Sequence, residues 1–85
     1  MLEETVIRWR DEAIREGRRE GRKEGLQEGR LQARREMLLE QMAQRFGRLP
    51  TLVRQQVEAI SSIQELRKLG RKVVRAKSLE EMGLG

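Results

Sequence analysis

The chain has 85 residues, of which 39% are charged and 36% hydrophobic, and its formal net charge at pH 7 is +5. It contains no Cys or His, which excludes disulfides and zinc sites as stabilising devices, and Trp9 and Phe46 are its only aromatic residues. A chain of this composition has room for at most one small domain plus an extended element, so oligomerisation is the remaining route to stability.

The first residues, Met1 to Glu4, include two acids and are followed by no apolar run, so they are not expected to form a signal peptide. No stretch of the sequence approaches the roughly 18 consecutive apolar residues of a membrane span. The lack of cysteine fits a reducing compartment. We therefore expect a cytoplasmic protein with no membrane partner.

One long helix is predicted over residues 2–46. Leu2, Val6, Trp9 and Ala13 recur at the spacing of one helix face, and no Pro occurs before Pro50. At about 1.5 Å per residue this helix is roughly 65 Å long. Because ordinary globular helices are much shorter, we expect it to have a coiled-coil-like partner.

A column of mostly small residues runs along this helix at strict four-residue spacing. Each Gly inside a helix costs about 1 kcal/mol relative to Ala, so the four glycines of the column cost roughly 4 kcal/mol, and contact with a second helix would offset this cost. The alternative is a polar linker that is only partly helical. We call the following residues the small-residue column, and we predict that they form an oligomer seam: Trp9, Ala13, Gly17, Gly21, Gly25, Gly29, Ala33 and Met37.

The two flanks of the small-residue column carry opposite charges. A parallel pair of helices would set the acidic flank of one chain against the basic flank of the other, whereas an antiparallel pair would set like against like, so we expect a parallel homo-oligomer, a dimer or higher. A stripe that repeats every four residues also wraps around a helix in the right-handed sense. The acidic flank is Glu12, Glu16, Glu20, Glu24 and Glu28, and the basic flank is Arg18, Arg22, Arg30 and Arg34, interrupted by Leu26.

The second half of the chain predicts a small helical hairpin that shares the end of the long helix. Gly47 is placed for a left-handed helix cap, Pro50 restarts the chain, and Ser62 and Ser78 each begin a capping box. The fold class is therefore all-α, with an oligomerising unit at 1–36 and a small C-terminal domain at 37–82. The apolar residues expected to face its core are Leu38, Leu39, Met42, Phe46, Leu52, Val53, Val57, Ile60, Ile63, Leu66, Leu69, Val73, Val74, Leu79 and Met82.

Excess positive charge lies in the C-terminal half. Residues 1–36 carry 10 Lys and Arg against 9 acids, a net charge of +1, and residues 37–85 carry 9 against 5, a net charge of +4. The clustered cations of this half form either a solvated helix face or a contact for nucleic acid. Because no aromatic residue is present in this cluster to stack on bases, such a contact would bind phosphates and recognise little of the base sequence. The candidate residues, which we call the basic face, are Arg67, Lys68, Arg71, Lys72 and Arg75.

The sequence offers no catalytic constellation. His, Cys and Tyr are absent, and most of the few Ser and Thr residues are assigned to helix caps. The acidic flank is neutralised by neighbouring Arg, so we expect no metal site. The glycines follow one helix-spaced column and do not lie between a strand and a helix, so they form no phosphate loop. We expect neither an enzyme nor a bound cofactor.

The order of several short motifs resembles the C-terminal domain of unknown function in the bacterial recombination-promoting nuclease (Rpn) and transposase family. The resemblance spans about residues 12–82 and rests on Glu-Gly-Arg repeats followed by Arg45-Phe46-Gly47-Arg48-Leu49-Pro50, Val53, Leu66, Leu69 and Ala76-Lys77-Ser78-Leu79-Glu80-Glu81.

This resemblance implies an N-terminal metal-dependent nuclease domain of the PD-(D/E)xK type, whose motif this chain lacks, since Asp11 is its only Asp. The chain is then a fragment or a separately made tail. The resemblance also implies short C-terminal products that restrain the full-length nuclease by joining its oligomer. We therefore expect a non-catalytic oligomerisation and regulatory module, with DNA binding through the basic face as the alternative.

Overall fold

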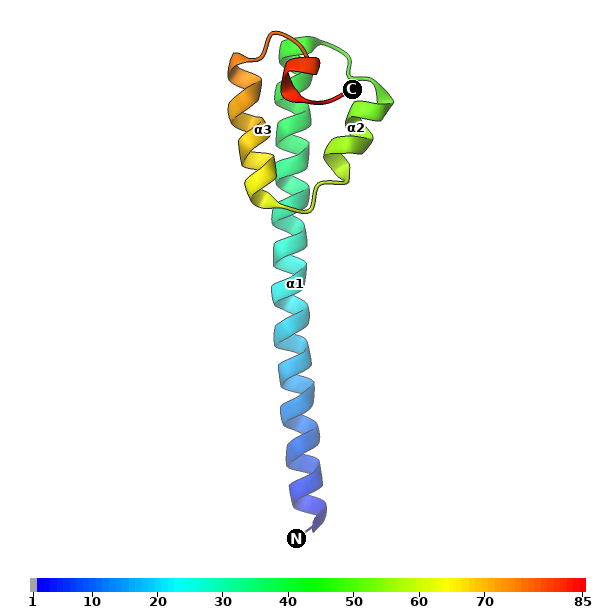
Figure 1. Ribbon diagram of the computed structural model, residues 1–85. Coiled ribbons are helices and arrows are strands. Elements are labelled where there is room, and N and C mark those ends of the chain that lie inside the picture. The colour runs from blue at the N-terminus through cyan, green and yellow to red at the C-terminus, as the bar shows by residue number, and fades with distance from the viewer. Residues whose placement is uncertain (1) are drawn as a thin grey trace.

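The structure, a computed structural model, describes the backbone of residues 2–85 and the side chains of residues 8–85. Its elements are α1 (Leu2–Phe46), α2 (Thr51–Glu58), α3 (Ile63–Arg75) and the 3₁₀ helix η1 (Glu80–Met82) (Figure 1). No strand occurs in the described part of the chain, and the predicted all-α class is confirmed. The predicted apolar positions Leu2 and Val6 lie outside the described side chains.

The long helix α1 extends far beyond the rest of the molecule. The molecule measures 70 × 21 × 17 Å, and α2 and α3 pack only beside the C-terminal end of α1 (Figure 1). Every residue from 8 to 30 is exposed, and we call this part of α1 the stalk. The stalk thus has no covering element within the chain.

The predicted helix boundaries follow from local chemistry. The N–H of Gly47 donates to the carbonyl of Ala43 at 2.9 Å, and the φ of Gly47 is +81°, so α1 ends in the left-handed cap that favours Gly. At the start of α3, the Ser62 hydroxyl accepts the Glu65 N–H at 3.3 Å. The Ser78 hydroxyl accepts the Glu81 N–H in the same way before η1, also at 3.3 Å.

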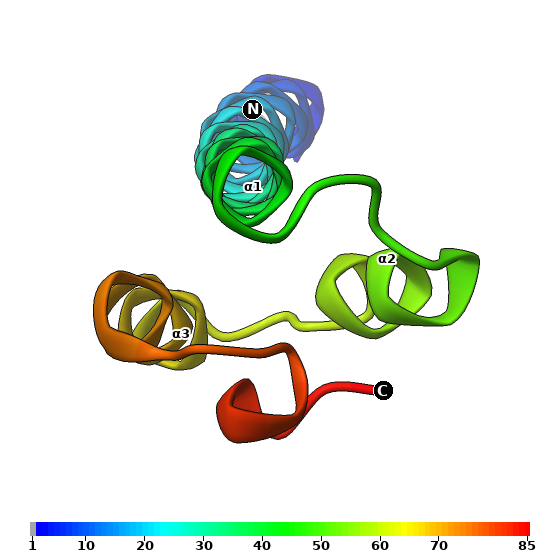
Figure 2. The ribbon, with the colours of Figure 1, turned by 90° about the horizontal axis from the view of Figure 1, so that it is seen from above.

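A small core lies between the C-terminal end of α1 and the other elements. Seen from above, α3 and α2 flank one side of α1, and η1 lies between them across from α1 (Figure 2). α2 runs antiparallel to α1, and α3 runs parallel to it (Figure 1). The buried hydrophobic residues are Leu38, Met42, Leu49, Val53, Val57, Leu66, Val73, Ala76 and Met82.

Two apolar residues that we predicted to face this core point outward. Leu52 is 55% exposed and Val74 is 70% exposed. Each neighbours a buried Val in sequence, Val53 or Val73, and successive residues of a helix differ by about 100° in direction. The prediction was wrong because it counted both members of each apolar pair as inward, whereas the narrow contact of a short helix buries only one.

Two arginines of α1 hold the other helices in place, and the sequence analysis assigned neither of them this role. Arg35 is buried, and its Nε donates to the carbonyl of Ile60, just after α2, at 2.9 Å. The Nε of Arg45 donates to the carbonyl of Ala76, at the end of α3, at 2.8 Å. Each bond satisfies a carbonyl near a helix terminus, where no intrahelical donor is available.

Candidate functional site

The small-residue column is exposed along its whole length. Trp9 at one end is 67% exposed, and Met37 at the other end is 53% exposed. A Cβ atom added at any of the four column glycines would meet no neighbouring atom within 4 Å. No contact within the described part of the chain therefore requires glycine at these positions or offsets their cost of about 4 kcal/mol.

The column does not follow one side of α1 but winds around it. Residues 18 positions apart lie five turns apart and share a direction, so Gly17 points to the side of buried Arg35. Each four-residue step adds about 40°, and the seven steps of the column add about 280°. Its N-terminal half thus faces the side on which α2 and α3 pack, whereas Met37 lies at the border of α3 and lines a pocket with Leu66 and Arg67. A straight partner helix would contact only neighbouring steps, such as Gly21 and Gly25; a longer contact requires right-handed coiling.

The charged flanks find little compensation within one chain. Among the described side chains, the one ion pair within 4 Å joins Arg35 and Glu28 at 3.5 Å. Glu16, Glu20 and Glu24 instead lie one helix turn from other acids, and like charges at this spacing cost about 0.2–0.5 kcal/mol per pair. Glu16 and Glu20 also lie one turn from Arg19 and Lys23, and pairs at this i, i+3 spacing offset part of the repulsion.

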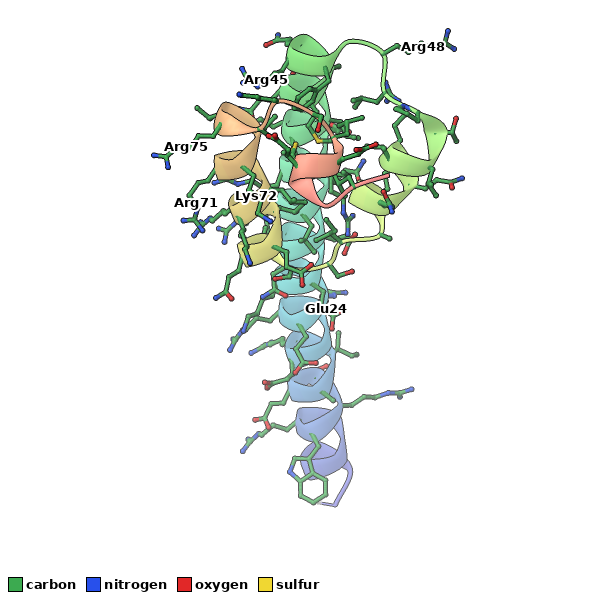
Figure 3. The ribbon with its side chains drawn as sticks, turned by 45° about the horizontal axis from the view of Figure 1, so that its top comes forward. Glu24, Arg45, Arg48, Arg71, Lys72 and Arg75 are labelled. Atoms are coloured by element: carbon green, nitrogen blue, oxygen red, sulfur yellow. The ribbon has the colours of Figure 1, made fainter. Side chains whose placement is uncertain are left out.

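The basic face lies on the side of α3 opposite its buried residues. Leu66 and Val73 point into the core, and all five cations are exposed. Arg71, Lys72 and Arg75 project from the outer side of α3 (Figure 3). No described carboxylate lies within ion-pairing distance of any of the five. The structure thus gathers all five predicted residues on one solvent-facing surface.

A shallow groove of about 820 Å³ lies beside the basic face. One wall carries cations of α3, among them Lys68 and Lys72. Ala76 and Glu81 line the groove as well, and a carboxylate oxygen of Glu81 accepts the backbone N–H of Lys77 at 2.6 Å. Four cations of the basic face thus share this groove with one carboxylate, that of Glu81.

The described residues offer no metal site, and the comparisons with known proteins identify no relative of the chain. Within residues 8–85, no three His, Cys, Asp or Glu side chains gather closely enough to hold a metal ion. None of the helices in the described part of the chain has both the length and the apolar character needed to cross a membrane. Comparison with protein-family models, with curated proteins and with solved structures found no match. The small-residue column, its charged flanks and the basic face are the candidate functional features of the chain.

Proposed function

We propose that this chain is a non-catalytic module that self-associates in parallel through the small-residue column. One observation carries the proposal: four glycines at helical spacing lie exposed, and no described atom near them requires the absence of a side chain. A helix in water gains nothing from such glycines, and they lower the stability of an isolated stalk. A second helix packed against the column offsets this cost.

Close approach of the two backbones is the source of that stabilisation. Helices whose facing positions are small come close enough to gain dispersion and weak Cα–H···O contacts. Small residues at four-residue spacing favour right-handed crossings, the sense in which the column winds around α1. A crossing centred between Gly21 and Gly25 places these glycines at the point of closest approach, and Trp9 and Met37, each about 140° further around α1, join the contact only where the helices coil.

The charged flanks fix the orientation of this pairing. In a parallel dimer, Glu20 of one chain lies beside the basic flank of the other chain. Within that flank, Arg22 is the expected partner of Glu20. Acids that repel each other within one chain then have cations to face in the second chain. An antiparallel dimer would add repulsion between chains to the repulsion within each chain.

A double-mutant cycle at Glu20 and Arg22 tests the orientation. These residues are two positions apart and do not face each other within one helix, so any coupling between them arises between chains. We expect Glu20→Arg and Arg22→Glu each to weaken the dimer, by about 0.3–1 kcal/mol, and the double variant to regain most of the loss. Sedimentation equilibrium measures all three. Strictly additive losses would count against parallel pairing, and a monomeric wild-type chain at tens of micromolar would remove the proposal.

The resemblance to the Rpn family suggests what else the column binds. A full-length nuclease of that family with the same column in its tail would form mixed oligomers with this chain. We propose that the chain regulates such a nuclease by joining its oligomer and restraining DNA cleavage.

The test of this regulation adds the chain to such a nuclease and measures both DNA cleavage and the size of the complex. Wild-type chain should form mixed oligomers and lower the cleavage rate, and the Gly21→Leu/Gly25→Leu variant should do neither. Unchanged cleavage in the presence of proven mixed oligomers would exclude restraint. The absence of mixed oligomers would exclude this partner and leave self-association standing.

A further inference from the structure

The charge of the basic face is concentrated and unbalanced. Arg67, Arg71 and Arg75 follow one another at four-residue spacing, as do Lys68 and Lys72. These like-charged neighbours cost about 0.2–0.5 kcal/mol per pair, and no described carboxylate lies within 4 Å of their charged nitrogens. Favourable interaction with the C-terminal end of the helix dipole accounts only for cations in the last turn, Lys72 and Arg75. Arg67, Lys68 and Arg71 lie before that turn, and the helix dipole does not account for them.

The shape of this surface fits a groove of duplex nucleic acid. The three arginines lie along one line of α3, about 6 Å apart and about 12 Å from first to last. α3 lies at the periphery of the molecule, and no other helix covers its outer side (Figure 2). An α-helix with side chains is about 10–12 Å across, and the major groove of B-form DNA is about 12 Å wide.

We propose that the basic face of α3 binds the phosphate backbone of double-stranded DNA, with Arg67, Arg71 and Arg75 along the helix and Lys68 and Lys72 beside them. Arginine forks bind phosphate oxygens through charge-assisted hydrogen bonds, and each neutralised phosphate releases a condensed counterion. The face carries no aromatic side chain, so it has no platform for stacking on unpaired bases. Binding is therefore electrostatic and depends little on sequence.

Two other polyanionic surfaces fit the same helix less well. A helix that binds a membrane surface inserts its apolar side between lipids, but the apolar side of α3 is occupied by the core through Leu66 and Val73. Duplex RNA has a deep and narrow major groove that a helix does not enter. B-form DNA is the polyanion that accepts α3 without rearrangement of the fold.

The test compares two double charge reversals that change the net charge equally. Arg71→Glu/Arg75→Glu alters the basic face, and Arg48→Glu/Arg54→Glu alters exposed arginines elsewhere; each variant lowers the net charge from +5 to +1. Figure 3 shows Arg48 on the other side of the molecule from Arg71 and Arg75. The probe is a short fluorescent DNA duplex, titrated with the full chain over a range of salt concentrations, and circular dichroism verifies that each variant is folded.

Wild-type affinity should fall steeply with salt. Two lost phosphate contacts, each contributing about 0.9 to the slope of log K against log salt, should weaken binding about 50-fold near 0.1 M salt and lower the slope by about two. The control variant should stay within a few-fold of wild type. Where the reversal disturbs folding, Arg71→Gln/Arg75→Gln replaces it and should lower the slope by the same amount.

Three outcomes would overturn the proposal. Equal losses in both double variants would mean that net charge alone drives binding. No binding at low salt would exclude DNA as a ligand. Equal or tighter binding to anionic lipid vesicles or to duplex RNA would assign the face to another polyanion. Self-association is measured without DNA, so its failure and the failure of this proposal are distinguishable.

Discussion

Replacing Gly21 and Gly25 with Leu separates the needs of a single chain from those of an oligomer. Within one chain a Cβ at either position meets no neighbour within 4 Å, so the larger side chains fit without strain. Leu also favours a helix over Gly by about 0.8 kcal/mol per site. The free energy of helix formation in the isolated stalk should therefore become more favourable by about 1.5 kcal/mol per chain. In a seam, the same side chains hold the two backbones apart.

We therefore expect circular dichroism to show that the variant is more helical than wild type. In sedimentation equilibrium the variant should associate at least about tenfold more weakly, a loss of about 1.4 kcal/mol, or shift to another oligomer size. Gln27→Leu is the control, because Gln27 is exposed, neutral and two residues removed from the column, on the outward side. It should leave the oligomer unchanged. A double variant that keeps the wild-type oligomer and tightens it would refute close backbone packing.

Two further variants test the C-terminal domain at concentrations where the chain is monomeric. Met42 is fully buried, so Met42→Ala should lower the free energy of unfolding by about 2–5 kcal/mol in thermal or urea denaturation. Its control is Met37→Ala, at an exposed site, which should change this free energy by less than about 0.5 kcal/mol. Arg45→Ala removes the donor to the Ala76 carbonyl and should cost about 1–3 kcal/mol, whereas Arg48→Ala, at an exposed position, should be nearly neutral. Equal losses within either pair would contradict the packing described above.

Most of the fold is readable from the sequence because its signals are local. The apolar spacing around Met42 and the caps at Gly47 and Ser62 each depend on neighbouring residues, and helix boundaries follow from them. Which of two adjacent apolar residues is buried is not a local property. The outward positions of Leu52 and Val74 are set by how α2 and α3 lie against α1, and that arrangement has no counterpart in helical periodicity.

The two arginine anchors show the same limit. Arg35 lies in a run of charged residues, and nothing near it in the sequence distinguishes it from the exposed Arg34. Its partner, the carbonyl of Ile60, lies 25 residues later, and that of Arg45 lies 31 residues later. A backbone carbonyl carries no residue-specific signal, so such contacts become visible only in the structure.

The candidate site is predictable to a different extent in its two parts. The exposed position of the basic face follows from the sequence, because helical spacing places its members on one side of α3, and its contact with nucleic acid stays a prediction. The small-residue column was predicted as a set, but its position relative to the C-terminal domain required the structure. The turn of about 40° per step places Gly17 on the side of buried Arg35 and turns Met37, five steps later, about 200° further around α1.

Disulfide trapping tests parallel pairing through the column most directly. The chain has no cysteine, so a single introduced cysteine reports on one position. Gly17→Cys and Gly29→Cys lie about 18 Å apart along one helix, beyond the 4.4–6.8 Å between Cα atoms that a disulfide spans. Parallel pairing predicts that each variant alone forms a covalent homodimer under mild oxidation, faster than Lys23→Cys on the outward side. A disulfide that forms only when the two column variants are mixed, or no faster than at Lys23, would contradict the proposed seam.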